Sequence, residues 1–286
     1  MSKQEIPVIG LQLTVYGLEE YKALEKPIPV AVMFALHGRV QNMTKMDPIC
    51  QAICKLNTNP CKKRHIIVVA FDHPNHGSRK IHHLSNYGWS ENGYANPNHA
   101  MDMWSMLYNS ARTVSDLVDV LEHYLFGPQY ESRVQVWGVV GFSMGGHASI
   151  LAAAQDPRLT VCIPIVGTAD FLGLMERRLQ ETDLSAHAHL PKPFCEMVKQ
   201  RTANLENHLS STKLLMISGQ KDKLVPPSSN DAFISRLSKV HRGKENVDWK
   251  CVIVPGVGHE WCPEMIDMSV EWCDKWMVHT LPPNKL

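Results

Sequence analysis

The chain has 286 residues, and its 29 lysines and arginines nearly balance 28 aspartates and glutamates, which leaves a formal net charge of +1. Hydrophobic residues make up 44% of the chain and charged residues 20%, a composition that argues against intrinsic disorder. The balanced charge favours no polyanionic partner, so we expect no nucleic-acid binding. No apolar run approaches the length that a membrane helix requires, about 18 residues. The N-terminus has no apolar core of a secretory signal, so neither membrane attachment nor export is expected.

Short β-branched runs alternate with longer helical patterns along the chain. Residues 8–16 are expected to add an edge strand or a hairpin at the start. Buried strands are expected at residues 30–36, 66–71, 134–140, 159–166, 214–218 and 249–254, because their continuous apolar runs suit strands covered on both faces. Helices are expected near residues 99–125, 144–154, 227–239 and 264–279. This order predicts an α/β fold with a mostly parallel central sheet and helices on both faces.

Two long intervals interrupt the alternation. Residues 170–211 carry apolar and charged residues at helical spacing, broken by Pro191 and Pro193, and predict a small helical lid over one end of the sheet. Residues 72–98 are rich in His, Asn, Gly and Tyr, and connections this long in a compact domain are usually functional or disordered. We therefore expect residues 1–286 to form a single domain with 170–211 as a lid inserted within it.

The eight cysteines of the chain indicate reduced thiols and a cytoplasmic location, because the chain is large and shows no export signal. Cys50, Cys54 and Cys61 lie close together, but their spacing does not match a zinc site, so we expect buried thiols on a helix near 47–56 and no metal. The terminal Asn-Lys-Leu differs from the peroxisomal signal Ser-Lys-Leu at its first residue, which leaves that alternative open.

The sequence Gly141-Phe142-Ser143-Met144-Gly145-Gly146 joins an expected strand to an expected helix. G-x-S-x-G in this setting is typical of a nucleophilic serine on a sharp, strained turn. Gly141 and Gly145 remove side chains that would collide where the strand and helix meet. The turn raises the serine oxygen above the sheet and places the Met144 N–H beside it, where a helix N-terminus favours negative charge. The alternative is a glycine-rich turn with an incidental serine.

A nucleophilic serine needs a base and an orienting carboxylate. Asp222 and His259 each follow an expected strand, so they should lie with Ser143 at the carboxyl edge of the sheet. Their order along the chain, Ser, Asp, His, is typical of this architecture. Asp222 could instead be a simple turn residue, and Asp170 is a rival acid at another strand end. We favour Asp222, because its loop directly precedes the strand that carries the histidine.

Four motifs together resemble the α/β-hydrolase-fold serine hydrolases, in particular esterases. They are ALHGRV at 35–40, GFSMGG at 141–146, GQKDKLVP at 219–226 and GVGHEW at 256–261. The resemblance implies that the N–H groups of Arg39 and Met144 form the oxyanion hole and that His37 is structural. NHAMDM at 98–103 is similar to the same region of dienelactone-hydrolase-like and prolyl-peptidase-like esterases. Residues 72–78 resemble the family's D-x-x-G-x-G-x-S turn, but Asn75 replaces its first glycine, so we expect a structural turn there.

These residues predict two-step acyl transfer from a small-molecule ester, with Ser143 as nucleophile and no cofactor or metal. A thioesterase, lactonase or peptidase would use the same triad, and a non-catalytic ligand-binding protein is a further alternative. The aromatic residues of the 87–108 region could line the substrate pocket or anchor the core. Tyr87, Trp89 and Trp104 are the candidates, with Tyr94 and Tyr108 beside them. Arg39 could meet a substrate carboxylate or lie at the surface. The sequence leaves the oligomeric state open.

Overall fold

The computed structural model of the chain describes residues 1–90, 93, 95–127, 133–182 and 184–280. Tyr94 and the C-terminal Asn-Lys-Leu, considered above, lie outside the described residues. Within the described ranges, no helix combines the length and the apolar character that crossing a membrane requires.

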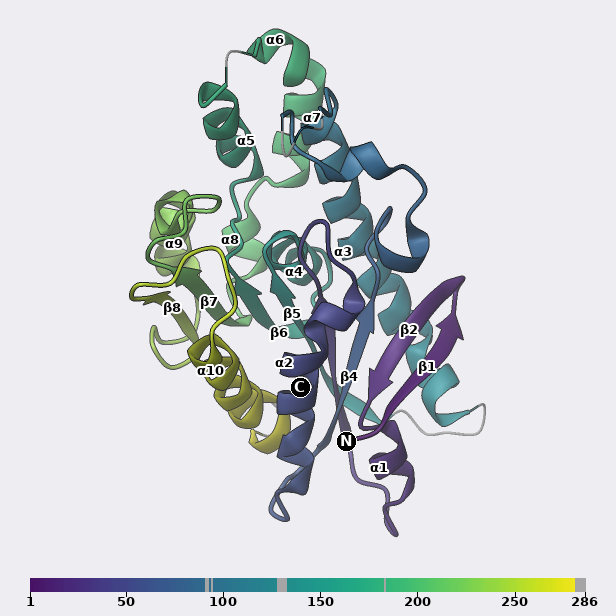
Figure 1. Cartoon of the computed structure of the whole chain (residues 1–286). Helices are drawn as coiled ribbons and strands as arrows, with labels where there is room; N and C mark the ends of the chain where they lie inside the picture. Colours follow the sequence, from purple (N-terminus) through teal and green to yellow (C-terminus); the bar gives the residue numbers. More distant parts are fainter. Residues whose placement is uncertain (91–92, 94, 128–132, 183, 281–286) are drawn as a thin grey trace.

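Eight strands form one sheet in the order β1-β2-β4-β3-β5-β6-β7-β8 (Figure 1). The strands are β1 (Lys3–Val8), β2 (Leu11–Tyr16), β3 (Val30–Leu36), β4 (His65–Phe71), β5 (Val134–Phe142), β6 (Leu159–Ile165), β7 (Lys213–Gly219) and β8 (Trp249–Val254). Strands β4, β3, β5, β6, β7 and β8, in their order across the sheet, pair in parallel. Strands β1 and β2 form an antiparallel hairpin, and β2 pairs antiparallel with the edge of β4. The predicted strands are confirmed. Of the two alternatives for residues 8–16, an edge strand or a hairpin, the structure has the hairpin, and its first strand begins earlier, at Lys3.

Helices connect the strands. They are α1 (Leu18–Lys22), α2 (Asp47–Cys54), α3 (His99–Phe126), α4 (Met144–Gln155), α5 (Phe171–Gln180), α6 (Ala186–His189), α7 (Lys192–Arg201), α8 (Leu205–His208), α9 (Asp231–Val240) and α10 (Pro263–Cys273), which continues as a π-helix over Asp274–His279. Short 3₁₀ helices occur at Met43–Met46, Lys55–Thr58, Gly77–Arg79, His83–Asn86 and Pro227–Asn230. The helices expected near 99–125, 144–154, 227–239 and 264–279 are present with ends shifted by a few residues.

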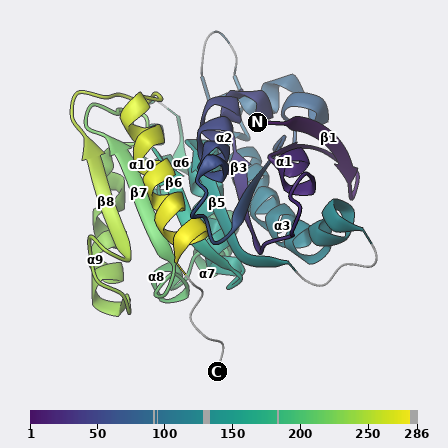
Figure 2. The same cartoon turned by 90° about the horizontal axis from the view of Figure 1, so that it is seen from below.

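The central strands are buried on both faces, and their side chains alternate between two cores. Along β3, Val32 and Phe34 belong to a core that includes residues of α3 and α4, whereas Ala31 and Met33 face a core with residues of α2 and α10. Figure 2 shows α2 and α10 lying across one face of the sheet. Because a strand places successive side chains on opposite faces, a fully apolar strand requires helices on both. The predicted fold class, a mostly parallel sheet with helices on both faces, is confirmed.

The interval between β6 and β7 is helical, as expected. It holds α5, α6, α7 and α8, and the first three extend beyond one end of the sheet (Figure 1). Of the 72–98 connection, the described residues include the two short 3₁₀ helices at Gly77–Arg79 and His83–Asn86. The thiols of Cys50 and Cys54 are free and buried on α2, and burial raises their pKa. Cys61 is free and exposed.

Candidate active site

Ser143 lies on the turn between β5 and α4. Its backbone adopts φ 53° and ψ −114°, a conformation that costs an L-residue roughly 1–3 kcal/mol and that clusters at functional sites. Backbone hydrogen bonds to β6 and to α4 hold the turn, since Ser143 N–H donates to Ile165 O at 2.8 Å and Ser143 O accepts from His147 N–H at 3.0 Å. The serine side chain is thereby fixed above the carboxyl end of β5, as the motif predicts.

The glycines of this turn are required by close backbone contacts. A Cβ on Gly141 would lie 2.0 Å from Gly145 O, and a Cβ on Gly145 would lie 2.0 Å from Leu36 O. Backbone atoms cannot move aside as a flexible side chain could, so both positions exclude any larger residue. The predicted steric role of the two glycines therefore matches the geometry, and it brings the β3 end of the sheet next to the serine turn.

Ser143, His259 and Asp222 form one hydrogen-bonded chain. The Ser143 Oγ lies 2.7 Å from His259 Nε2, and His259 Nδ1 lies 2.7 Å from Asp222 Oδ2. With its proton on Nδ1, the imidazole donates to the carboxylate and accepts the hydroxyl proton at Nε2. The other oxygen of Asp222 accepts from the N–H groups of Leu224 and Val225, both at 2.9 Å. Asp222 thus holds its own turn and orients the ring, while the ring of Phe142, 5.6 Å from the imidazole, packs beside it.

The loop that follows β3 carries Arg39 to the same place. The N–H of Gly38 donates to Gln41 Oε1 at 3.1 Å, and the N–H of Val40 donates to His76 Nε2 at 3.1 Å. Val40 has φ 62°, a second strained residue beside the serine turn. Both neighbours of Arg39 are therefore held by side chains, and Arg39 itself lines the cavity that contains Ser143. The Arg39 guanidinium donates to Asn86 O at 2.7 Å.

Three buried histidines support this loop. His37 Nδ1 donates to Gly38 O at 2.7 Å and its Nε2 accepts from the His73 N–H at 3.1 Å, while His73 Nε2 donates to His37 O at 2.8 Å. Burial lowers the pKa of His37, His73 and His76, so all three are neutral near pH 7 and can accept hydrogen bonds. This arrangement agrees with the structural role expected for His37.

The 72–78 turn is structural, as its departure from the family pattern suggested. Asp72 accepts from Met43 N–H at 2.8 Å through Oδ1 and from Ser78 N–H at 2.7 Å through Oδ2. A Cβ on Gly77 would lie 2.1 Å from the Asp72 carboxylate, and Gly77 has φ 48°. Asn75 occupies the left-handed region at φ 60°, which Asn tolerates better than most residues, so it can stand where the family has glycine.

A cavity of about 200 Å³ opens over the triad. Its lining comes from the β3 loop, α3, the serine turn, α5 and the loops that follow β7 and β8. The lining residues are Gly38, Arg39, Val40, Gln41, Met103, Phe142, Ser143, Arg178, Leu224 and His259. Apolar side chains and two arginines thus surround the serine and histidine, which is the mixture of apolar and polar groups expected of a small-molecule site.

A protein-family model matches most of the chain and shows its family. Residues 87–280 match the model of the prolyl oligopeptidase family, Peptidase_S9, which is more than half of the sequence. The chain belongs to the prolyl oligopeptidase family. The match includes the serine turn, Asp222 and His259, and it confirms the expected family of serine hydrolases. A curated relative, the putative hydrolase YtaP of Bacillus subtilis (strain 168), is 26% identical over 183 residues, which cover 61% of this chain. The match spans about half of that relative, 54% of its length.

Solved structures share the fold of this family member at low sequence identity. TT1662 from Thermus thermophilus superposes with a TM-score of 0.68 at 15% identity and covers 96% of this chain and 98% of its own. A cold-adapted esterase from an Arctic intertidal metagenomic library has a TM-score of 0.58 at 15% identity, with 96% and 92% covered. The Pyrococcus furiosus esterase Pf2001 has a TM-score of 0.57 at 18% identity, with the same coverage. These likenesses confirm the α/β-hydrolase fold.

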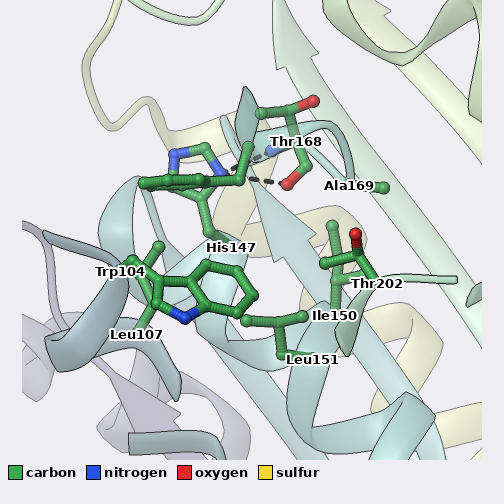
Figure 3. Close-up of a pocket in the computed structure, with 9 residues that line it drawn as sticks. Trp104, Leu107, His147, Ile150, Leu151, Thr168, Ala169 and Thr202 are labelled. Atoms are coloured by element: carbon green, nitrogen blue, oxygen red, sulfur yellow. Dashed lines mark hydrogen bonds between the residues drawn. The ribbon is translucent and has the colours of Figure 1, made fainter. Parts of the chain in front are cut away.

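Among the described residues, the aromatic pocket candidates are absent from the lining of the cavity over the triad. Trp89 is buried against His99, with ring centroids 5.2 Å apart, and the Tyr87 ring packs on His83. Trp104 stacks on Tyr108 and lines a separate, very small cavity of about 10 Å³ next to His147 (Figure 3). There the His147 Nδ1 accepts from Thr168 N–H at 2.8 Å, which fixes the ring behind the serine turn. A substrate role for Tyr87, Trp89 and Trp104 stays a prediction.

Several cavity residues carried no local signal in the sequence. Arg178 and Met103 lie in ordinary amphipathic helices, and only the packing of α5 and α3 brings them to the serine. Gln41 was missed as well, although it follows the His-Gly pair closely and a polar side chain there could have suggested a loop cap. Asp170, the rival acid, is the N-cap of α5, where its Oδ1 accepts from Gly173 N–H at 2.9 Å.

Proposed function

We propose that the protein is a serine hydrolase that cleaves a small carboxylic ester through an acyl-enzyme intermediate. Ser143 is the nucleophile, His259 the general base and acid, and Asp222 the orienting carboxylate. The observation that carries the proposal is the pair of 2.7 Å hydrogen bonds that join these three side chains across 116 and 37 positions of the sequence. A protein that only bound ligands would not need a strained serine aligned with a histidine and a buried aspartate.

The geometry gives each step a defined proton path. As the Ser143 Oγ attacks the ester carbonyl carbon, its proton moves to His259 Nε2, and Asp222 stabilises the imidazolium. The N–H groups of Arg39 and Met144 hold the oxyanion, and Met144 adds the favourable field of the α4 N-terminus. The intermediate collapses, and the leaving alcohol takes the proton from His259. Water then attacks the acyl-enzyme with His259 as base, which releases the acid and restores Ser143.

A carboxylic ester is favoured over the other acyl substrates because the cavity is small and short helices border it. We propose that the chain forms one domain and that its 170–211 insertion is a lid over this cavity. The structurally similar proteins include esterases, and the relative YtaP is named a putative hydrolase. A thioesterase, lactonase or peptidase would use the same residues. For the ester-cleaving enzyme we infer a small-molecule substrate as its partner and a cytoplasmic location.

Labelling with a fluorophosphonate probe tests the nucleophile. We expect the wild-type protein to be labelled and Ser143→Ala to lose labelling and ester hydrolysis together, because the probe requires an activated hydroxyl. Ser105→Ala is the matched control, since Ser105 is an exposed serine of α3 whose hydroxyl donates only within its own helix, to Met101 O. Labelling that persists in Ser143→Ala would reject Ser143. A panel of p-nitrophenyl esters, acyl-CoAs and aminoacyl amides then separates the esterase from its alternatives.

A further inference from the structure

The apolar side chains that line the cavity over the triad extend from its interior to its mouth. Met103 and Phe142 are buried, whereas Val40 is 48% exposed and Leu224 is 53% exposed. Val40 follows β3 and Leu224 follows β7, and β5, which leads to Ser143, lies between these two strands in the sheet. The two half-exposed side chains therefore flank the serine from opposite sides.

The backbone of Val40 indicates that its side chain is retained at a cost. A single exposed apolar residue needs no explanation by itself. Val40, however, has φ 62°, a region that a β-branched residue rarely adopts and that glycine or asparagine adopts more readily. Its N–H donates to the buried ring of His76 at 3.1 Å, which holds it in this conformation. Asparagine would suit this backbone better, so the strain indicates a use for the valine side chain itself.

Leu224 belongs to the turn that orients the catalytic imidazole. Its N–H donates to Asp222 Oδ1 at 2.9 Å, and its carbonyl oxygen accepts from Arg177 Nη2 at 3.3 Å. The next residue, Val225, is buried in the core. The turn thus holds both backbone groups of Leu224 and leaves its side chain at the mouth of the cavity that contains His259.

Two arginines also line the cavity, and both make contacts within the protein. The Arg39 guanidinium donates to Asn86 O at 2.7 Å, and Arg178 Nη1 lies 3.4 Å from His99 Nε2. A substrate that displaced these contacts would break hydrogen bonds, which costs free energy unless new ones replace them. The two half-exposed aliphatic side chains can be covered without breaking any hydrogen bond, so the cavity mouth favours contact with an apolar group.

We infer that Val40 and Leu224 form an apolar clamp for a hydrocarbon chain of the substrate. The preferred substrates are then esters with an apolar chain of several carbons next to the scissile bond. The inference rests on the proposed ester hydrolysis at Ser143 and names its substrate class. Covering the exposed half of each clamp residue removes apolar surface from water, which favours binding. The chain can belong to the acyl or the alcohol part of the ester, and two substrate pairs separate these cases.

Chain length is the variable that tests the clamp. p-Nitrophenyl acetate and p-nitrophenyl hexanoate differ in the acyl part, and ethyl acetate and hexyl acetate differ in the alcohol part. With every substrate kept as a dissolved monomer, we expect the wild-type kcat/KM to favour the longer ester in at least one pair. Leu224→Ser and Val40→Asn should each reduce this preference by on the order of 5-fold, as expected when about half of an aliphatic side chain no longer contacts the substrate.

Two exposed isoleucines provide matched controls. Ile9, in the turn between β1 and β2, is 46% exposed and has φ 44°, so Ile9→Asn relieves the same kind of strain as Val40→Asn. Ile253, on the edge strand β8, is 55% exposed and matches Leu224. Ile9→Asn and Ile253→Ser should keep the wild-type preference. The unfolding midpoint of Val40→Asn should be no lower than that of the wild type, because relief of strain offsets the lost apolar contact.

Binding is also measured without ester cleavage, so that the clamp and the hydrolase proposal can fail independently. 2-Octanone and 2-butanone offer a long and a short chain and no ester bond. We expect the wild type to bind 2-octanone more tightly in isothermal titration calorimetry, and both clamp variants to reduce the difference. If this result is obtained and no ester is cleaved, the hydrolase proposal fails and the clamp stands. A longer chain that gives no advantage, or an advantage that both clamp variants retain, would overturn the inference.

Discussion

Asp170 and Asp222 occupy equivalent places in the sequence but have different surroundings. Each follows a parallel strand at the carboxyl edge of the sheet, β6 for Asp170 and β7 for Asp222. Asp170 caps α5 through the Gly173 N–H, whereas Asp222 is 3% exposed and binds the His259 imidazole. Strand-end position therefore selects candidates for the orienting acid, and only the hydrogen bonds distinguish between them.

The substitution Asp222→Asn should lower kcat by roughly 10⁴-fold, as expected when an amide holds the catalytic imidazole in the wrong tautomer. The side-chain oxygen of Asn can still accept from Leu224 and Val225, so the turn and the fold should be retained. The measurement is kcat with p-nitrophenyl butyrate, together with the urea unfolding midpoint.

Asp170→Asn is the matched control for this prediction. Asn caps helices about as well as Asp, so both activity and stability should stay close to wild type. If Asp170→Asn loses far more activity than Asp222→Asn, the assignment of the orienting acid is wrong.

At the scale of elements, the β5–α4 turn depends on contacts between backbones. Gly145→Ala should destabilise the fold by about 3 kcal/mol or more, because its Cβ would lie 2.0 Å from Leu36 O and 2.7 Å from His37 O. The clash separates the serine turn from the oxyanion loop, so the surviving folded protein should also lose activity. Urea unfolding gives the first quantity and the initial rate of ester hydrolysis gives the second.

Gly258→Ala provides the control for the effect of a methyl group near the site. A Cβ there would find only Glu260 Oε1 at 3.9 Å, so stability should change little. Equal losses of stability in the Gly145 and Gly258 variants would show that steric contact does not explain the need for glycine at Gly145.

The sheet could be predicted because its strands carry their own signal. Strands such as β3 and β4 are buried on both faces, so their apolar runs mark them without knowledge of their neighbours. Their ends were predicted within one or two residues, and the strand-end rule then placed Ser143, Asp222 and His259 together. The five-residue helix α1 was missed, since one turn of helix has too few residues to show a period.

The walls of the cavity could not be predicted in this way. Arg178 lines the cavity that contains Ser143, whereas the adjacent Arg177, of the same residue type, donates to Ser229 Oγ instead. The aromatic residues of the 87–108 region were attractive candidates by composition, yet Trp104 packs on Tyr108 and Phe171. Side-chain direction on a helix depends on tertiary packing, so residue type alone does not separate a pocket wall from a core anchor.

At the scale of the whole molecule, several histidines of the described residues are buried and neutral. Burial lowers the pKa of His99 and of His147 to about 3, and it also lowers the pKa of His37 and His73. In the unfolded chain these groups would titrate near about 6.5. Their contribution to stability is therefore fully present above pH 6.5 and is lost as the pH falls toward the folded-state values, because the unfolded chain takes up protons that the folded protein excludes.

The free energy of unfolding should consequently fall steeply between pH 6 and pH 4. Each such histidine adds a slope of about 1.4 kcal/mol per pH unit in this window, so His99 and His147 alone give about 3 kcal/mol per unit. Carboxylates with a lowered pKa, such as Asp156, lose their contribution to the free energy of unfolding mainly at a lower pH than this window. The slope between pH 6 and pH 4 therefore reports mainly on the histidines. Urea unfolding at half-unit steps of pH measures the slope. His147→Gln should reduce it by the share of one histidine, and a free energy of unfolding that stays constant from pH 7 to pH 4.5 would contradict the neutral, buried state of these rings.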